Sequence, residues 1–309
     1  MIYFYLKGFD TMRRLLGCLA AAVCIALVSA AGADEPTKYD LKYKFAPGET
    51  IRSRVTHTSD VHTTIKNTHE KATSKAESEK VWRVTAVSPT DEATFEYSVD
   101  YVAMRGKVGD YAEVVYDSRK DVVPPDVYKG VAKTVKTPIA EITLDARGRV
   151  VKREVKLQNA PANVSGGSVT LPMPNEPIAV GHSWYDDFKI PVKVDGAAGA
   201  KIDRQIKARQ KYKLESVTDG IARISVVTQV LDPALPAAIE VQLVQRILNG
   251  ELRFDIAKGR IVSQSMKVDG SVIDFHGAGS LMKCKMEIVE ELVSAAVETA
   301  KKDERTEKK

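Results

Sequence analysis

Apolar residues recur at every second position over unusually long stretches of this chain. Ala93, Phe95, Tyr97, Val99 and Tyr101 follow one another without a break, and polar residues separate most of them. This alternation is typical of a β-strand that buries one face and exposes the other. Comparable runs occupy residues 39–45, 202–214, 222–230, 248–256 and 266–272. The pattern predicts a mainly β protein with a mostly antiparallel sheet.

The length of these runs constrains the shape of that sheet. Some reach about a dozen residues, which gives strands of roughly 40 Å at about 3.4 Å per residue. Strands that long twist and coil, so we predict a long-stranded, curved antiparallel sheet or half-barrel. One or two short helices should cover it. Pro124-Pro125-Asp126 can start a helix, and Val127, Val131 and Val135 share one helical face, which predicts a helix near residues 124–136.

The chain also carries the pattern of two diverged copies of one unit. The matched stretches, first copy and then second, are 45–49 and 178–184, 81–87 and 211–217, and 142–151 and 252–262. The last pair reads as a strand, a turn from aspartate to glycine and a returning strand. Chance hairpin turns explain one match better than three in the same order. We therefore predict an internal duplication.

These patterns divide the chain into five predicted segments. They are a signal peptide at 1–33, a first β unit at 34–157, a connector at 158–177, a second β unit at 178–295 and a charged disordered tail at 296–309. The connector is rich in Asn, Pro, Gly and Ser, which favours a surface loop.

The first segment predicts export. Met12, Arg13 and Arg14 precede a short apolar run through Val28, and small residues follow at 31–33, as in a cleaved secretory signal. The apolar run is shorter than the ~20 residues that cross a bilayer. We predict translation from Met12 and a periplasmic or secreted protein without a transmembrane segment in the mature chain.

Charge and cysteine content exclude some classes of protein. The net charge is +5, and lysines alternate with acids, as in residues 75–80, so there is no concentrated basic face for nucleic acid. Cys18 and Cys24 lie in the signal peptide, which leaves Cys284 alone and allows no disulfide within the mature chain. Its apolar neighbours predict a buried side chain.

No set of residues in the sequence predicts catalysis. His57, Asp60, His62 and His69 could contribute to a metal site, but the odd spacing of His57 and His62 places these two on opposite faces of a strand. Gly181-His182-Ser183-Trp184 sets a serine beside a histidine without the G-x-S-x-G turn that a nucleophile needs. A turn into a strand anchored by a buried Trp184 explains it better. We expect no catalytic residue, cofactor or metal ligand, and an unrecognised enzyme is the third hypothesis.

Several short motifs resemble an uncharacterised family of bacterial exported β-proteins. They are residues 43–49, 180–184, Tyr116-Asp117-Ser118 and the two turns from an aspartate to Gly-Arg. The likeness spans most of the mature chain, and the family has no established activity to carry over. At the level of fold, the expected shape is also similar to the half-barrel of bacterial lipoprotein carriers and other periplasmic lipid-binding proteins.

The leading hypothesis is a non-enzymatic exported protein that binds a lipid or other amphiphile on the apolar concave face of its sheet. The candidate cavity residues are Phe95, Tyr97, Val99, Trp184, Tyr212, Leu214 and Phe254. A closed core without a ligand is the competing interpretation of these residues. The alternative function is an envelope or cell-surface structural protein, in which the hairpin at 56–80 projects toward a protein partner.

Overall fold

The structure is a computed structural model that describes residues 35–158, 170–195 and 201–297. The predicted signal peptide with its Met12 start, residues 159–169 of the connector and residues 298–309 of the tail lie outside the described residues. All of the described residues except Glu35 belong to one unit, Pro36–Lys309.

Strands dominate the described residues. They are β1 (Lys38–Tyr39), β2 (Glu49–Ile65), β3 (Thr68–Val87), β4 (Ala93–Val108), β5 (Val114–Asp117), β6 (Ala140–Leu144), β7 (Val150–Val155), β8 (Ile178–Ala179), β9 (Ser183–Asp195), β10 (Lys201–Thr218), β11 (Ile221–Val230), β12 (Asn249–Asp255), β13 (Arg260–Ile273) and β14 (Leu281–Val297). The helical segments of the described residues are the 3₁₀ helix η1 (Asp126–Tyr128), α1 (Lys129–Ala132) and α3 (Ala237–Leu243).

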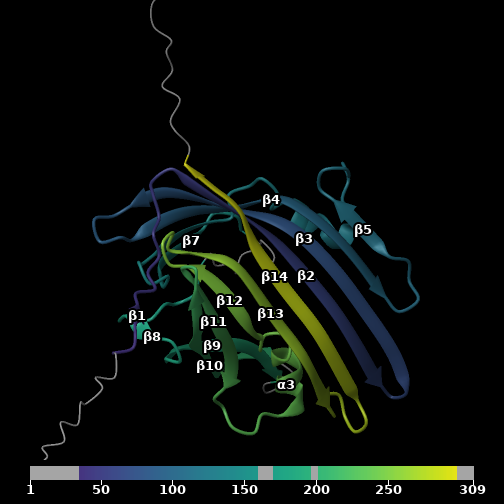
Figure 1. Cartoon of the computed structure of the whole chain (residues 1–309). Coiled ribbons are helices and arrows are strands. Elements are labelled where there is room, and N and C mark those ends of the chain that lie inside the picture. Colours follow the sequence, from purple (N-terminus) through teal and green to yellow (C-terminus); the bar gives the residue numbers. More distant parts are fainter. Residues whose placement is uncertain (1–34, 159–169, 196–200, 298–309) are drawn as a thin grey trace, which may run out of the picture. The chain divides into compact units, whose positions relative to one another are not determined.

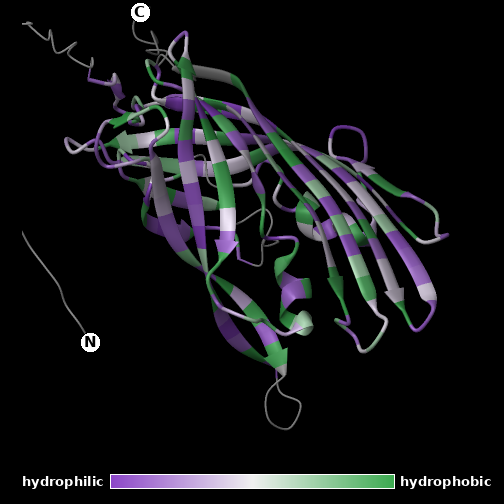
Figure 2. Cartoon of the chain, turned by 60° about the horizontal axis from the view of Figure 1, so that its bottom comes forward, coloured by the Kyte–Doolittle hydropathy of each residue, from purple (hydrophilic) through white to green (hydrophobic). Residues whose placement is uncertain are grey.

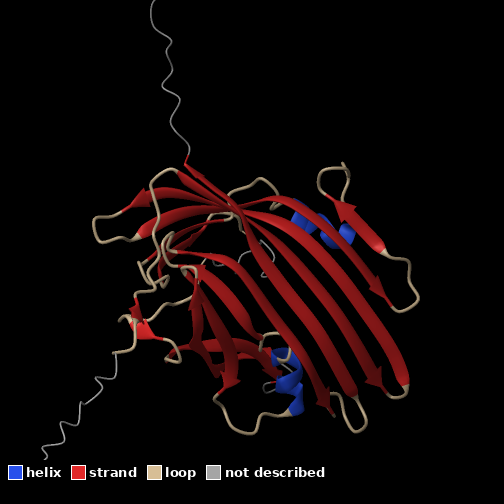
Figure 3. Cartoon of the chain, in the orientation of Figure 1, coloured by secondary structure: helices blue, strands red, loops and turns tan. Residues whose placement is uncertain are grey.

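Twelve strands of the described residues form one antiparallel sheet. Its order is β7-β6-β4-β3-β2-β14-β13-β12-β11-β10-β9, with β5 beside β4, while β1 and β8 pair separately. We call β2, β3, β4, β6 and β7 the first meander, and β9 to β13 the second meander. The two join where β14 pairs with both β13 and β2. The sheet is curved (Figures 1 and 3), and no ladder joins its end strands β7 and β9 in the described residues, which confirms the predicted fold class.

The two faces of the sheet differ in polarity. On β14, Cys284 and Ile288 face one side and Lys285 the other, because side chains alternate along a strand. Both helical segments lie on the side of Cys284: Val244, at the end of α3, packs with Cys284, and Val131 of α1 packs against the core of the first meander. We call this side the inner face and the other the outer face. Figure 2 shows both helical segments within the curve of the sheet.

Two large apolar cores lie on the inner face, one beneath each meander, and two smaller clusters pack around α3. In the first core Trp82 stacks on Tyr97, with ring centroids 4.3 Å apart. In the second core Trp184 stacks on Tyr212, with centroids 5.4 Å apart. Phe45 packs against both cores, so the N-terminal segment connects them. The burial of Trp184 and of Cys284 (8% and 1% exposed) confirms two sequence predictions.

The stretch at 39–45 differs from its predicted strand. Only Tyr39 belongs to a strand, yet Leu41 and Tyr43 are buried against the second core. The backbone N–H of Tyr43 donates to the carbonyl of Ala146, and that of Lys44 to the carbonyl of Gly259. The alternation therefore reflects burial of one side of an extended segment whose backbone bonds to two turns rather than to a strand.

The helical segment after β5 is shorter than the predicted helix at 124–136. Pro125 precedes a 3₁₀ turn, and a single α turn follows it. A 3₁₀ helix has three residues per turn, and here Tyr128 is buried while Val127 is exposed. Val131 and Val135 pack against the first core as the spacing predicted, whereas the prediction is wrong for Val127, and Tyr128 is buried beside it.

The hairpin at 56–80 lies in the middle of the sheet. β2 pairs with β14, and β3 pairs with β4, along most of their lengths. Lys66 and Asn67 adopt positive φ at its tip. Since neighbouring strands use its backbone groups, the expectation of a projecting hairpin is wrong for all but the tip.

Candidate functional site

A cavity of about 290 Å³ opens on the inner face between α1 and strands β2, β3, β4 and β14. We call it the inner cavity. Its apolar walls come from the sheet and from Val131 of α1. The apolar side chains that line it include Val55, Ala76, Val99, Met104 and Ile288. A concave apolar space with a few polar groups is the usual form of a small-ligand site.

One edge of the inner cavity carries a buried acid with three hydrogen-bond donors. Glu290 accepts hydrogen bonds from Ser53 Oγ at 2.6 Å, from Gln264 Nε2 at 3.0 Å and from Lys80 Nζ at 3.1 Å. The side chains of Lys80 and Glu290 are 18% and 10% exposed. Buried charges are tolerated when they are paired and hydrogen-bonded. This group therefore places a compensated ion pair, not a free charge, beside the cavity.

His57 lies four residues along β2 from Ser53 of this group and lines the inner cavity. Its Nε2 atom is shielded from solvent and has no hydrogen-bond partner among the described residues. Burial lowers the pKa of His57, because the charged imidazolium loses solvation. His57 therefore lies beside the inner cavity as a neutral imidazole whose Nε2 atom is shielded from the open space.

The register of the strands identifies the position in the second meander that matches His57. Ile51 lies opposite Trp82 in the first meander, and Trp184 lies opposite Tyr212 in the second. Six residues further along each strand, His57 lies opposite Ala76, and Ile190 lies opposite Ile206. His57 therefore matches Ile190, and Ala76 matches Ile206.

At these matched positions of the second meander, isoleucine side chains occupy the inner face. Ile190 and Ile206 are 4% and 0% exposed, and they pack with Ile239 and Leu243 of α3. Isoleucine fills the volume there that His57 and Ala76 leave open beneath α1. The inner cavity therefore exists because smaller and polar side chains occupy one end of the first meander.

A second space of about 370 Å³ continues along the inner face toward the ends of the strands. Ser59, Ser74 and Gly106 line it, one step along their strands from His57, Ala76 and Met104. A Cβ at Gly106 would lie 3.1 Å from the hydroxyl of Tyr128, so glycine makes room for this side chain. Tyr111, which is 78% exposed, lines the outer end.

The predicted cavity residues divide between the inner cavity and the closed cores. Tyr97 and Val99 line the inner cavity, and Phe95 lies beside them in the first core. The remaining four lie in the second core: Trp184, Tyr212, Leu214 and Phe254. All seven are buried, and contact of any of them with a ligand stays a prediction.

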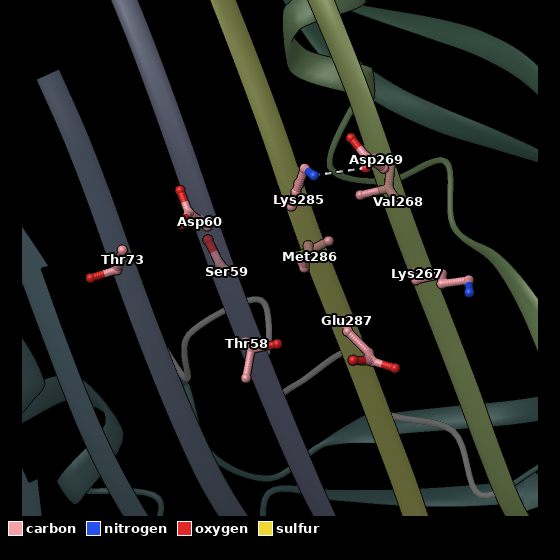
Figure 4. Close-up of a pocket in the computed structure, with 10 residues that line it drawn as sticks. All are labelled: Thr58, Ser59, Asp60, Thr73, Lys267, Val268, Asp269, Lys285, Met286 and Glu287. Atoms are coloured by element: carbon pink, nitrogen blue, oxygen red, sulfur yellow. Dashed lines mark ion pairs between the residues drawn. The ribbon is translucent and has the colours of Figure 1, made fainter. Parts of the chain in front are cut away.

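The outer face carries a surface groove of different character. Charged side chains of β13 and β14 line it, and Lys285 Nζ lies 3.2 Å from Asp269. Figure 4 shows this pair together with Asp60, Lys267 and Glu287. Because both signs of charge alternate on an exposed face, this groove does not suit an apolar ligand.

The other sequence candidates lie apart from the inner cavity. His62 contacts Asp60 at 2.8 Å, and His69 shares a hydrogen bond with Thr64. Within residues 35–158, 170–195 and 201–297, no three His, Cys, Asp or Glu side chains are grouped to hold a metal ion. Gly181 has a φ of +89° in the turn before β9, which confirms the predicted turn.

Sequence analysis did not identify His57, Lys80 and Glu290 as one group. The signal for His57 was its even spacing from Val55 and Ile51, which places all three on the same face of β2. The meeting of Lys80 with Glu290 depends on the pairing of β14 with β2, which joins residues 210 positions apart. Local patterns do not contain that information.

No protein-family model matches the chain, and no curated protein matches it. Among solved structures, one of lipid–protein interactions in lipovitellin is similar, with 11% identity, 82% of this chain and 26% of that chain covered, and a TM-score of 0.47. DynF from the dynemicin biosynthesis pathway of Micromonospora chersina matches with 8% identity over 89% of this chain and 92% of that chain, with a TM-score of 0.21.

A third similar structure is a putative outer membrane lipoprotein-sorting protein domain from Vibrio parahaemolyticus. It has 8% identity and a TM-score of 0.12, with 81% of this chain and 87% of that chain covered. This chain spans about a quarter of the lipovitellin chain. The similarity to known proteins is distant, and with TM-scores below 0.5 none of these likenesses decides the function. No helix in the described part of the chain has the length and apolar character needed to span a bilayer.

Proposed function

We propose that this protein is an exported, non-enzymatic binding protein whose inner cavity holds the apolar chain of a lipid or other amphiphile. One observation carries the proposal. The inner face is closed by isoleucine packing under α3 but stays open, with apolar walls and a few polar groups, under α1. An apolar space of this kind gains free energy when it takes an apolar ligand from water.

The size of the space fits a chain rather than a bulky ring system. A volume of about 290 Å³ lies near the lower end of the range for ligand sites, roughly 300–1,000 Å³. The second space of about 370 Å³ lies further along the same strands. We infer that a linear apolar chain that begins in the inner cavity extends into this second space, toward Tyr111 at the strand ends.

Native mass spectrometry with lipid extraction tests this proposal. The full chain is expressed with its own N-terminal segment and purified without detergent. We expect a co-purifying amphiphile in defined stoichiometry. A clean protein mass that stays unchanged after challenge with lipid would overturn the proposal.

A cavity-filling variant locates the site. Ala76→Ile introduces the residue found at the matched position, Ile206, and should reduce ligand occupancy about tenfold or more. Thr58→Ile adds similar bulk on the outer face of the neighbouring strand β2 and should leave occupancy unchanged. Equal occupancy in both variants would place the ligand elsewhere and contradict the assignment of the inner cavity.

A further inference from the structure

Exposed apolar side chains are concentrated in the segment that runs from the end of β4 to η1. Of the 17 large apolar side chains that are exposed in the described part of the chain, seven lie within residues 108–127. They are Val108, Tyr111, Val114, Val115, Val122, Val123 and Val127. Single exposed apolar residues are normal on a protein surface, whereas a cluster marks a site of interaction.

Four of these side chains surround the mouth of the second space. Val108, Tyr111, Val114 and Val127 line this space and are exposed to solvent as well, so they lie where it opens. Val122 and Val123 lie on the loop that leads from β5 to η1. We call these six side chains the apolar rim. Among the described strands β5 pairs with β4 alone, at the margin of the sheet (Figure 1), so the rim borders open solvent.

Packing within the protein does not explain the apolar character of the rim. Tyr116 and Tyr128 hold β5 against η1, because their rings stack with centroids 6.2 Å apart and the Tyr128 hydroxyl donates to the carbonyl of Val114 at 3.3 Å. Val122 and Val123, which are 96% and 77% exposed, add little to this packing. The rim is therefore an apolar surface on a fixed support.

The charges around the rim narrow the class of partner. Residues 108–127 include two basic and five acidic side chains. Both basic side chains are paired, Arg119 with Glu79 at 2.7 Å and Lys120 with Asp117 at 3.2 Å. An excess of carboxylates repels anionic lipids and attracts the ammonium groups of zwitterionic head groups. The segment therefore suits phosphatidylcholine or phosphatidylethanolamine better than an anionic lipid.

We propose that the apolar rim docks on the surface of a bilayer of zwitterionic lipids, with its side chains among the head groups and the mouth of the second space facing the acyl chains. The choice of a bilayer rests on the function proposed above, because an amphiphile then passes from the bilayer into the second space without crossing water. Tyr111 suits this position, since tyrosine combines an apolar ring with a hydroxyl that stays hydrated at a membrane interface.

Sedimentation with lipid vesicles tests this docking surface. The full chain, expressed with its own N-terminal segment, is mixed with vesicles of phosphatidylcholine alone or of phosphatidylglycerol alone. We expect wild type to bind phosphatidylcholine at least as tightly as phosphatidylglycerol. Binding should change by less than about threefold between about 0.05 M and about 0.5 M sodium chloride, because salt screens charge attraction and not apolar contact.

A pair of matched double variants locates the surface. Tyr111→Ser with Val123→Ser removes two apolar side chains of the rim and should weaken binding to phosphatidylcholine about tenfold or more. Tyr185→Ser with Val151→Ser removes an exposed tyrosine and an exposed valine from the end strands β9 and β7, and should stay within about threefold of wild type. All four side chains are exposed, so both variants should fold, and far-ultraviolet circular dichroism checks this.

The outcomes separate this inference from the proposed function. A wild type that carries an amphiphile in native mass spectrometry but binds no vesicles overturns the docking surface and leaves the proposed function standing. Vesicle binding without a co-purifying amphiphile does the reverse. Equal losses in the two double variants, or binding to phosphatidylglycerol that high salt abolishes, also overturn the docking surface. A dimer in analytical ultracentrifugation that the rim variant alone loses would identify a second copy as the occupant, against the proposal.

Discussion

The two meanders share a set of local irregularities that simple strand pairing does not require. In the first, the register of β3 and β4 shifts between Val84 and Ala86, and in the second that of β10 and β11 shifts between Leu214 and Ser216. The last strand pair of each meander has a further shift, at Leu144 and at Phe254. Bulges change the local twist of a strand, so both halves bend at the same points.

The turns of the two meanders match as well. Gly48 donates its N–H to the carbonyl of Val84, and Gly181 donates to that of Leu214, at 2.9 and 2.7 Å. The predicted duplication would produce these matches, and common descent of the two halves stays a prediction.

The difference between the meanders lies beneath their helical segments. α3 covers Ile190 and Ile206 and leaves no space, whereas α1 covers His57 and Ala76 and leaves the inner cavity. The same backbone plan therefore supports a closed core in one half and an open one in the other. A few side chains determine whether the core is closed or open. Exchanging these side chains by mutation therefore tests the comparison.

The largest expected change in stability comes from exchanging the matched residues His57 and Ile190. Ile190→His should lower the free energy of unfolding by about 3 kcal/mol, because it removes packed apolar volume and buries an imidazole beneath α3. The reverse change, His57→Ile, should change it by less than about 1 kcal/mol, since isoleucine enters existing space. Urea denaturation of both variants measures these values.

Equal losses in the two variants would contradict this asymmetry. His57 would then be as tightly packed as Ile190, and the inner cavity would not be available to a ligand. A combined variant tests independence, because the two positions lie in separate clusters and their effects should add.

The comparison also shows what the sequence could predict. The long alternation correctly indicated the strands from Ala93 to Tyr101 and the curved sheet, because burial of one face imposes a period of two. It did not indicate α3, whose seven residues form about two turns and carry little periodic signal. The inner cavity depends on how α1 and α3 differ in their packing, which follows from contacts between residues far apart in sequence.

A loss of stability of intermediate size is expected when the glycines of the turns are replaced by alanine. Gly259 has a φ of +61°, and a Cβ there would lie 2.7 Å from both the carbonyl oxygen of Lys42 and the amide nitrogen of Lys44. Gly181 has a φ of +89° but nothing within 4 Å of that position. Gly259→Ala should therefore cost about 2–3 kcal/mol, and Gly181→Ala about 1 kcal/mol, the cost of left-handed backbone alone.

Thermal and urea unfolding of the two alanine variants measure this difference. The first meander supplies a matched control, because a Cβ at Gly148 would lie 2.8 Å from the carbonyl oxygen of Leu171. Gly148→Ala should resemble Gly259→Ala. If all three variants lose the same stability, the N-terminal segment does not clamp the two turns as the structure indicates.

The smallest expected effect is the dependence of stability on pH that His57 of the first meander contributes. The pKa of His57 is lowered in the folded state by burial, so near pH 7.5 the ring is neutral in both states. As the pH falls through the ordinary histidine value of 6.5, the unfolded chain binds a proton before the folded chain does. The free energy of unfolding then decreases until the folded imidazole is also protonated.

The variant His57→Ile isolates this contribution. The charged groups on the same face near His57 are Lys80 of β3 and Glu290 of β14, and they are present in both proteins. The other four histidines of the chain are also common to both, so their titration cancels in the difference. Urea denaturation at pH 7.5, 6.5 and 5.5 should show a steeper loss in wild type than in His57→Ile. Parallel curves would mean that His57 binds its proton equally well in both states, which would contradict the lowered pKa.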